Sequence, residues 1–122
     1  MKTIIFVYGT LKKGNHNHGF LDGASFIGEA WTKKQYTLLE DHYVGLPYVI
    51  KDESYSIQGE LYEVDKYTFM TLDNLEGHPH FYKRELVECF IPELNHTEMK
   101  AWLYFLQEYD VQAVRKLPTG LW

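Results

Sequence analysis

The stretch Ile4-Ile5-Phe6-Val7-Tyr8-Gly9-Thr10-Leu11-Lys12-Lys13-Gly14 decides how the rest of the chain is interpreted. Its first four residues are consecutive and apolar, which is typical of a strand covered on both faces. The strand then breaks into a loop with two glycines, Gly9 and Gly14, which can adopt backbone angles closed to other residues and let a ligand approach the main chain. Successive N–H groups in such a turn can form a concavity that binds an anion. The pattern predicts either a loop that holds a small ligand or an ordinary tight turn.

The two glycines have the spacing of the phosphate-binding loop G-x-x-x-x-G-K-[ST]. Asn15 stands where that motif needs its lysine, and His16 stands where it needs a hydroxyl. Without the lysine there is no point charge for the outer phosphates of a nucleotide. A nucleotide is therefore not the predicted ligand of this loop.

Length and composition narrow the class of protein. The 122 residues predict a single domain, 1–122, with one core. The formal net charge of −5 argues against a nucleic-acid binder, which needs clustered Lys and Arg. One cysteine, Cys89, excludes an intrachain disulfide and suits a reducing compartment. No apolar run approaches the roughly 20 residues of a membrane span, and no cleavage site follows the short apolar run at the N-terminus. We expect a cytoplasmic protein that binds neither nucleic acid nor membrane.

The chain alternates strand patterns with one clear helix pattern. Strands are predicted over residues 3–8, 24–31, 34–39, 56–64, 82–91 and 99–106, with a loop entering a short strand at 42–49. Gly28 marks a candidate bulge. Short helical pieces are expected in 15–21 and in the tail, 110–122. About six or seven strands around one principal helix predict an α+β domain with a small curved sheet or barrel.

The principal helix has both a start and a stop signal. Asp65 is a good N-cap, Gly77 lies at the position after the last helical residue, and Pro79 follows shortly beyond. The apolar residues at helical spacing between these signals are Phe69, Met70, Leu72 and Leu75.

Glu76 stands out because it is an acid at the wrong end of this helix. The C-terminus of a helix carries partial negative charge, so a carboxylate there is disfavoured by about 0.3–1 kcal/mol. If the site is also partly buried, both effects raise the pKa of the carboxyl. A carboxyl with a pKa near neutral is suited to general acid–base catalysis. The alternative is a solvated glutamate whose small penalty is tolerated.

Other chemistry-bearing residues give weaker patterns. His16 with His18, and His78 with His80, form two H-x-H pairs of the kind that can bind zinc from one strand face. Both pairs lie in loop-like segments without a cluster of Cys, Asp or Glu to complete a site, so no metal is predicted. Cys89 lies in the middle of a strand with no helix N-terminus beside it, and a reactive thiolate is not expected there.

Three segments, in this order, resemble the γ-glutamylcyclotransferase-like family. Tyr8-Gly9-Thr10-Leu11 with Gly14 is similar to its Y-G-[TS]-L loop, and residues 59–64 (GELYEV) are similar to its G-x-[LV]-[YF]-x-[VL] strand. Residues 72–77 (LDNLEG), followed by Tyr82-Lys83-Arg84, are similar to its L-D-x-x-E-G…Y-x-R segment. The short chain and the Y-G-T-L-K-[KR]-G form look most like the γ-glutamylamine cyclotransferase and AIG2-like branch.

The resemblance implies a small mixed β-barrel flanked by helices, and it assigns roles to named residues. The loop of Tyr8, Gly9, Thr10 and Leu11 matches the one that binds the γ-glutamyl group, and Glu76 matches the catalytic acid/base. Tyr82 and the region of Tyr104 are expected to form walls of the pocket. Arg84 is expected either to pair with a carboxylate or to be an exposed strand residue.

The implied reaction converts a γ-glutamylamine into 5-oxoproline and a free amine, such as lysine. The α-amine of the substrate attacks its own γ-carbonyl, so neither a nucleophilic side chain, nor a metal, nor a cofactor is needed. Three alternatives remain open: the same reaction on other γ-glutamyl peptides or metabolites, a non-catalytic module that binds a small γ-glutamyl or carboxylate ligand, and a metal-binding interaction domain that uses the four loop histidines. Glu76 argues against a pure binder of anions, because a carboxylate in the cavity repels such a ligand.

Overall fold

The computed structural model describes residues 3–122, which form eight strands, one α-helix and two short 3₁₀ helices. The strands are β1 (Thr3–Val7), β2 (Ser25–Thr32), β3 (Tyr36–Asp41), β4 (Pro47–Tyr55), β5 (Gln58–Val64), β6 (Tyr82–Ile91), β7 (Thr97–Leu106) and β8 (Val114–Lys116). The helices are α1 (Lys66–Glu76), η1 (His18–Leu21) and η2 (Pro92–Leu94).

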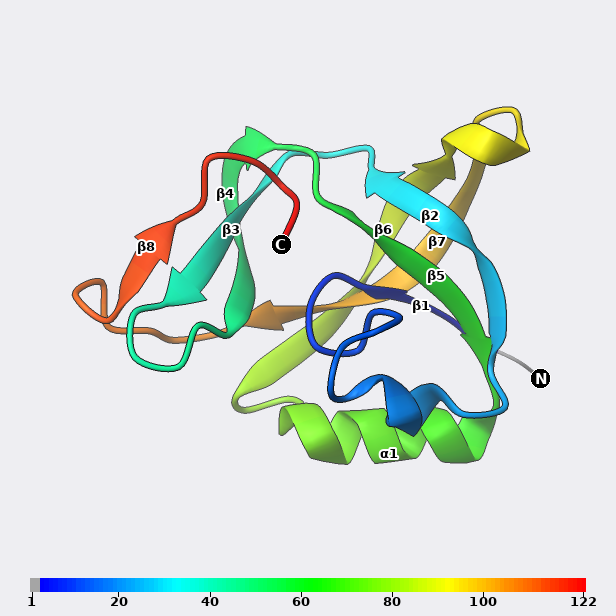
Figure 1. The fold of residues 1–122 in the computed structure, drawn as a ribbon, viewed down its shortest axis with the longest axis horizontal. Coiled ribbons are helices and arrows are strands. Elements are labelled where there is room, and N and C mark those ends of the chain that lie inside the picture. The colour runs from blue at the N-terminus through cyan, green and yellow to red at the C-terminus, as the bar shows by residue number, and fades with distance from the viewer. Residues whose placement is uncertain (1–2) are drawn as a thin grey trace.

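Five of the strands close into a barrel in the order β1-β5-β2-β6-β7. The pairing of β1 with β7 is parallel and the other pairings are antiparallel, so the barrel is mixed. The remaining strands form a small sheet in the order β4-β3-β8, which lies beside the barrel, and α1 lies along the barrel wall below the loop that follows β1 (Figure 1). The predicted α+β class and mixed barrel are confirmed, with one strand more than the expected six or seven.

The extra strand comes from the tail, where the prediction of a helical piece over residues 110–122 is wrong. Val114–Lys116 instead forms β8, which pairs antiparallel with β3. The open edge of β3 offers unpaired main-chain groups, and the tail satisfies them, whereas it has no apolar face at helical spacing to stabilise a helix. Beyond β8, the N–H of Gln58 donates to the carbonyl of Gly120 at 2.9 Å and fixes the tail to β5.

A second difference lies in β4, which is longer than the short strand expected at the end of 42–49. Its second half, residues 51–55, is mostly polar, so the sequence carried no alternating apolar signal there. The register with β3 shifts between Tyr36 and Thr37, which accommodates this polar part. The bulge predicted at Gly28 is confirmed by a shift of register between Phe26 and Gly28.

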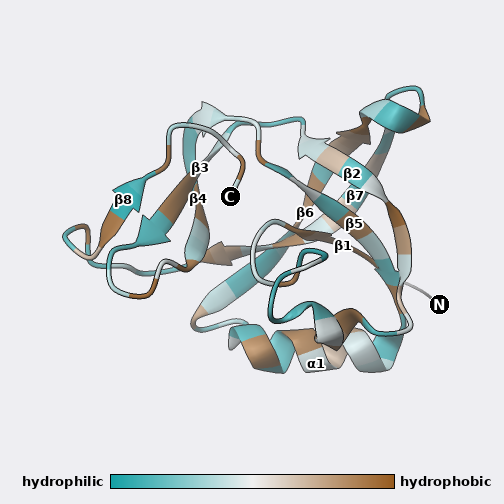
Figure 2. Ribbon diagram, in the orientation of Figure 1, coloured by the Kyte–Doolittle hydropathy of each residue, from teal (hydrophilic) through white to brown (hydrophobic). Residues whose placement is uncertain are grey.

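The consecutive apolar residues of β1 serve two cores, which explains why the strand does not alternate. Phe6 and Tyr8 belong to the core inside the barrel, whereas Ile5 and Val7 belong to a second core that Leu72 of α1 completes. β1 is accordingly almost entirely hydrophobic (Figure 2). The prediction that this strand is covered on both faces is confirmed.

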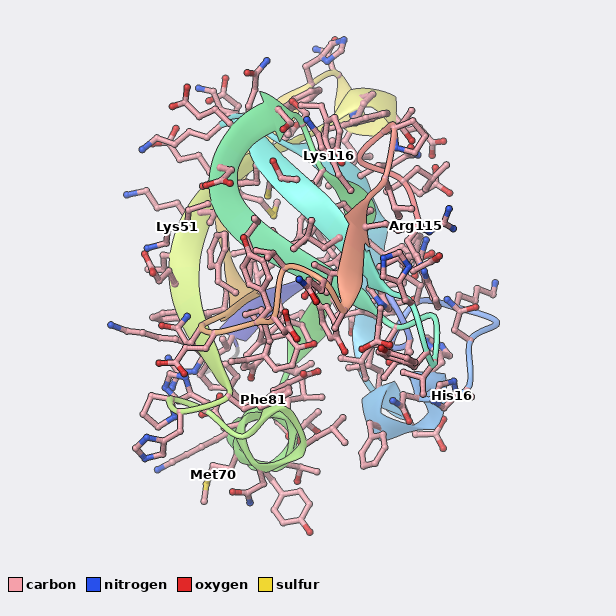
Figure 3. All side chains as sticks on the ribbon, turned by 90° about the vertical axis from the view of Figure 1, so that its left-hand side faces the viewer. His16, Lys51, Met70, Phe81, Arg115 and Lys116 are labelled. Atoms are coloured by element: carbon pink, nitrogen blue, oxygen red, sulfur yellow. The ribbon has the colours of Figure 1, made fainter. Side chains whose placement is uncertain are left out.

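Helix α1 begins and ends where its capping residues predict. The carboxylate of Asp65 accepts a hydrogen bond from the N–H of Thr68 at 2.7 Å, and Gly77 adopts the left-handed conformation with φ of 65°. Leu72 is fully buried, whereas Met70 is 56% exposed and points away from the barrel (Figure 3). The buried face of α1 is therefore narrower than the spacing of its apolar residues predicted. With this face against the barrel, the C-terminal end of α1 lies near the loop after β1.

Candidate active site

A cavity of about 270 Å³ opens where β1 ends. Its walls come from the loop after β1, the C-terminal end of α1, the start of β4 and the paired strands β6 and β7. Every residue that the sequence placed in a site lines this one cavity: Tyr8, Gly9, Thr10, Leu11, Glu76 and Tyr82. Tyr104 of β7 lines it as well. The fold thus brings together groups that the sequence separates widely.

The loop after β1 is held by hydrogen bonds to its carbonyl groups. The carbonyl of Gly9 accepts from the side-chain amide of Asn15 at 2.9 Å, and that of Thr10 accepts from the N–H of Asn17 at 3.0 Å. The carbonyl of Leu11 accepts from Nδ1 of His18 at 2.9 Å. The polar run after the loop, which we considered as a source of metal ligands, therefore contributes groups that fix the shape of the loop.

The N–H groups of the same loop, in contrast to its carbonyls, remain available. The N–H groups of Gly9, Thr10 and Leu11 donate to no acceptor within residues 3–122. Three adjacent free donors beside a cavity are suited to a carboxylate or to a developing oxyanion. The hydroxyl of Thr10 accepts from the side-chain amide of Asn17 at 2.9 Å, so its own hydrogen is free to donate.

Gly9 is needed for a reason other than the one the sequence indicated. Gly14 does adopt a positive φ, of 89°, but Gly9 does not. A Cβ at Gly9 would instead lie 2.5 Å from Cγ of Pro47, at the start of β4. The proline ring packs directly on the glycine and forms the opposite wall of the cavity.

Gly9→Ala is expected to lower the free energy of unfolding by about 1–3 kcal/mol, because the rigid proline ring must move to admit the methyl group. The shift of Pro47 is also expected to narrow the cavity and raise KM. Gly19→Ala is the matched control, since a Cβ there meets nothing within 4 Å. Urea unfolding of both variants measures the difference, and equal stability of the two would contradict the packing argument.

Glu76 is a half-buried acid with no partner in the folded chain. Its carboxyl makes no hydrogen bond or ion pair with any group of residues 3–122. Burial raises its pKa to about 7. At neutral pH the group is thus divided between its acidic and basic forms, which lets it both accept and deliver a proton. The raised pKa expected at this position has burial as its main cause.

The raised pKa of Glu76 predicts a dependence of stability on pH that is separate from catalysis. Between pH 4.5 and 7, unfolding releases a proton that the folded state retains. The contribution of this group to stability is therefore full below pH 4.5 and is lost as the pH rises to about 7, by about 1–3 kcal/mol. Glu76→Gln is expected to remove this loss, so the variant gains stability over the wild type between pH 4.5 and 8. Chemical unfolding across this range measures the gain, and a constant difference would refute the raised pKa.

Three tyrosines around the acid stay protonated. Burial raises the pKa of Tyr8, Tyr82 and Tyr104, and the nearby charge of Glu76 adds to each shift. The hydroxyl of Tyr8 donates to the carbonyl of Tyr104 at 3.0 Å, which ties the end of β1 to β7. The hydroxyl of Tyr82 donates to no group within residues 3–122, so it is available to a ligand.

A polar network beneath the cavity confirms the first of the two expectations for Arg84, that it pairs with a carboxylate. Nε of Arg84 donates to Oδ1 of Asp73 at 2.8 Å, and NH2 donates to Oδ2 at 3.1 Å. The hydroxyl of Tyr104 donates to the same carboxylate at 2.7 Å. Burial alone would raise the pKa of Asp73, but the bonds from Arg84 and Tyr104 outweigh it and lower the pKa. The network fixes the last turn of α1, and hence Glu76, to β6 and β7.

The histidine pairs and the cysteine do not form a second site. Within residues 3–122, no three His, Cys, Asp or Glu side chains gather in a group that would hold a metal ion. His78 accepts a hydrogen bond at Nδ1 from the N–H of Arg84, at 3.2 Å. Cys89 is buried in the barrel, and burial raises its pKa to about 11, which disfavours a thiolate. None of the helices in the part of the chain described here is long and apolar enough to cross a membrane.

Comparison with known proteins assigns the chain to a family. Residues 5–122 match the family described as gamma-glutamyl cyclotransferase, AIG2-like. A protein of Methanocaldococcus jannaschii named for the gamma-glutamylcyclotransferases is 44% identical over 107 residues, which cover 85% of this chain and 84% of that protein. The chain therefore belongs to the AIG2-like family of γ-glutamylcyclotransferases, a family of enzymes that act on small γ-glutamyl compounds.

Two further relatives agree with this assignment. The gamma-glutamylaminecyclotransferase of Bos taurus is 33% identical over 128 residues, covering 88% of this chain and 76% of that protein. The crystal structure of an AIG2-like protein from mouse superposes with a TM-score of 0.83 at 28% identity, covering 92% of this chain and 82% of the other. The family resemblance drawn from the three sequence segments is confirmed.

Proposed function

We propose that this protein is a γ-glutamylamine cyclotransferase that releases 5-oxoproline and a free amine. The observation that carries the proposal is the combination of an unpartnered acid, Glu76, whose pKa burial raises to about 7, with three free main-chain donors in the same cavity. The bovine relative named for this activity supports the choice of a γ-glutamylamine.

In the proposed mechanism the loop holds the glutamyl part of the substrate. The N–H groups of Gly9, Thr10 and Leu11 bind its α-carboxylate, because the cavity offers no lysine or arginine side chain from residues 3–122 to do so. Tyr8 shapes this end through its bond to β7 and does not itself donate to the substrate. The hydroxyl of Tyr82 donates to the γ-carbonyl oxygen as negative charge develops on it.

Cyclisation then requires only proton transfer. The ionised form of Glu76 takes a proton from the α-ammonium, and the freed amine attacks the γ-carbon to form the lactam C–N bond. Glu76 returns protons to the leaving nitrogen as the original C–N bond breaks. The two protons that the ammonium loses are those that the departing amine gains, so no water is consumed. Holding amine and carbonyl in contact supplies several kcal/mol of the barrier reduction, and the proton transfer supplies about 10²–10⁴-fold in rate.

Release of 5-oxoproline from a panel of γ-glutamyl amines and γ-glutamyl amino acids tests this function. Turnover of at least one γ-glutamyl amine is the expected result. Thermal stabilisation by the same compounds without any 5-oxoproline would instead identify a binding module.

A further inference from the structure

We infer that the substituent on the leaving amine is apolar along its body and carries no carboxylate, as in an alkylamine or arylalkylamine, so that the amine is not an amino acid or peptide. The inference rests on the proposed function and narrows its substrate class. The basis is the chemistry of one cavity wall, the wall that the glutamyl part of the substrate does not cover.

The cavity has two unlike sides. One side is the loop after β1, whose free N–H groups suit the glutamyl carboxylate. The other side is made by Leu46, Pro47 and Tyr48 at the start of β4, and by Leu75 and Phe81 around the end of α1. Glu76 follows Leu75 and so also lies on this second side, where it serves as the acid/base of the proposed mechanism. Once the glutamyl part occupies the loop, the leaving group faces the β4 and α1 side.

This second side is apolar and continues outward as exposed apolar surface. Phe81 is 58% exposed and stacks edge-on against Tyr82 at a centroid distance of 5.2 Å. Tyr43 and Val44, in the turn that carries Leu46, are exposed as well. Phe81 is labelled beside the end of α1 in Figure 3, and His16 of the polar loop lies at another part of the same cavity lining. Apolar substituents on the amine would bury this surface.

A leaving group with a carboxylate finds no cation at this side. Among residues 3–122 no lysine or arginine side chain lines the cavity, and the charged group that does, Glu76, repels an anion when ionised. The nearby cations are already engaged. The guanidinium of Arg84 is bound to Asp73 and lies 4.3 Å and 4.5 Å from the ring centroids of Phe69 and Trp102. The ammonium of Lys12 donates to the main-chain oxygen of Trp122.

A cationic leaving group, such as the far end of lysine, differs from an anionic one because Glu76 does not repel it. The acid next to the wall is Asp41, at the turn before β4. Its carboxylate already accepts from the N–H groups of Tyr43 and Val44, at 2.7 Å and 3.0 Å, and from the hydroxyl of Tyr48 at 3.2 Å. These bonds leave it little capacity for a further donor, so the ionised form of Glu76 is the acid that a cation would meet at this side.

The decisive test compares two substrates of the same shape with the full-length protein. γ-Glutamyl-3-methylbutylamide ends in two methyl groups on a branched carbon, and γ-glutamyl-β-alanine has a carboxylate in the same place. The kcat/KM for 5-oxoproline release is expected to be about 10²-fold higher for the methylbutylamide, because the carboxylate loses water without gaining a partner.

Phe81→Lys places a cation on the apolar side and is expected to reduce the preference for the methylbutylamide by at least tenfold. Leu94→Lys is the matched control, because Leu94 is 48% exposed and lies in η2, outside the cavity. It is expected to leave the preference unchanged.

Failure of the inference and failure of the proposed function are distinguishable. Equal kcat/KM within the pair, or a preference for β-alanine, overturns the apolar leaving group while the cyclotransferase activity stands. If no compound is turned over, the proposed function fails, and calorimetric binding of the same pair decides the inference. Tighter binding of the methylbutylamide upholds the apolar side, and equal or weaker binding overturns it.

Discussion

Glu76→Gln is expected to lower kcat for 5-oxoproline release by about 10³-fold while the protein stays folded. Glutamine has nearly the same shape as glutamate and can occupy the same position at the end of α1, but it cannot take a proton from the α-ammonium. The measurement is single-substrate kinetics on whichever γ-glutamyl amine the wild type turns over fastest.

The control for this variant is Glu93→Gln, which removes one exposed carboxylate from η2 and is expected to keep full activity. KM is expected to change little in Glu76→Gln, because in the proposed mechanism the N–H groups of the loop, and not the acid, bind the α-carboxylate of the substrate. Activity within tenfold of the wild type would exclude Glu76 as the acid/base. The stability of the variant between pH 4.5 and 8 provides a separate check that residue 76 was buried as described.

Arg84→Leu is expected to lower the free energy of unfolding by about 2–4 kcal/mol, because it leaves the carboxylate of Asp73 partly buried without its cation. Both side chains of this pair are only 21% exposed. The substitution also removes the contacts of the guanidinium with Phe69 and Trp102. Because the last turn of α1 loses an anchor, kcat is expected to fall together with stability. Urea unfolding and kinetics on the same preparation measure both effects.

Arg115→Leu is the matched control, since Arg115 pairs with Glu40 at the surface and is expected to contribute no more than about 1 kcal/mol. The double variant Asp73→Leu with Arg84→Leu is expected to be more stable than Arg84→Leu alone, because it removes the unpaired carboxylate. A single variant as stable as Arg115→Leu would show that the buried pair does not fix α1.

Local signals in the sequence were sufficient for α1 and for the acid that it presents. Asp65 and Gly77 act on neighbouring residues, so their capping roles can be inferred from spacing alone. The position of Glu76 at the end of the helix follows directly from these two caps. The double-sided burial of β1 was likewise visible in its unbroken apolar run.

Features that join distant parts of the chain could not be inferred in this way. The need for glycine at Gly9 depends on Pro47. The choice of Asp73 as the acceptor for both Arg84 and Tyr104 depends on how α1 lies against β6 and β7. The tail joins β3 through main-chain bonds that any sequence of moderate strand propensity can make. In each case the partner is chosen by the fold and leaves no periodic trace in the local sequence.

The division of the cavity between main-chain donors and side-chain walls has a consequence for how such enzymes diverge. Apart from proline, no substitution removes a main-chain N–H group, so in the proposed mechanism recognition of the glutamyl end tolerates most changes within the loop itself. It is sensitive instead to Asn15 and His18, whose side chains bond the carbonyls of Gly9 and Leu11, and to Asn17, whose side-chain amide donates to the hydroxyl of Thr10. The opposite side is built from side chains such as Leu46 and Phe81, each of which one substitution can replace. In the proposed mechanism, single substitutions on this side would therefore change the amine that is accepted while the reaction stays the same.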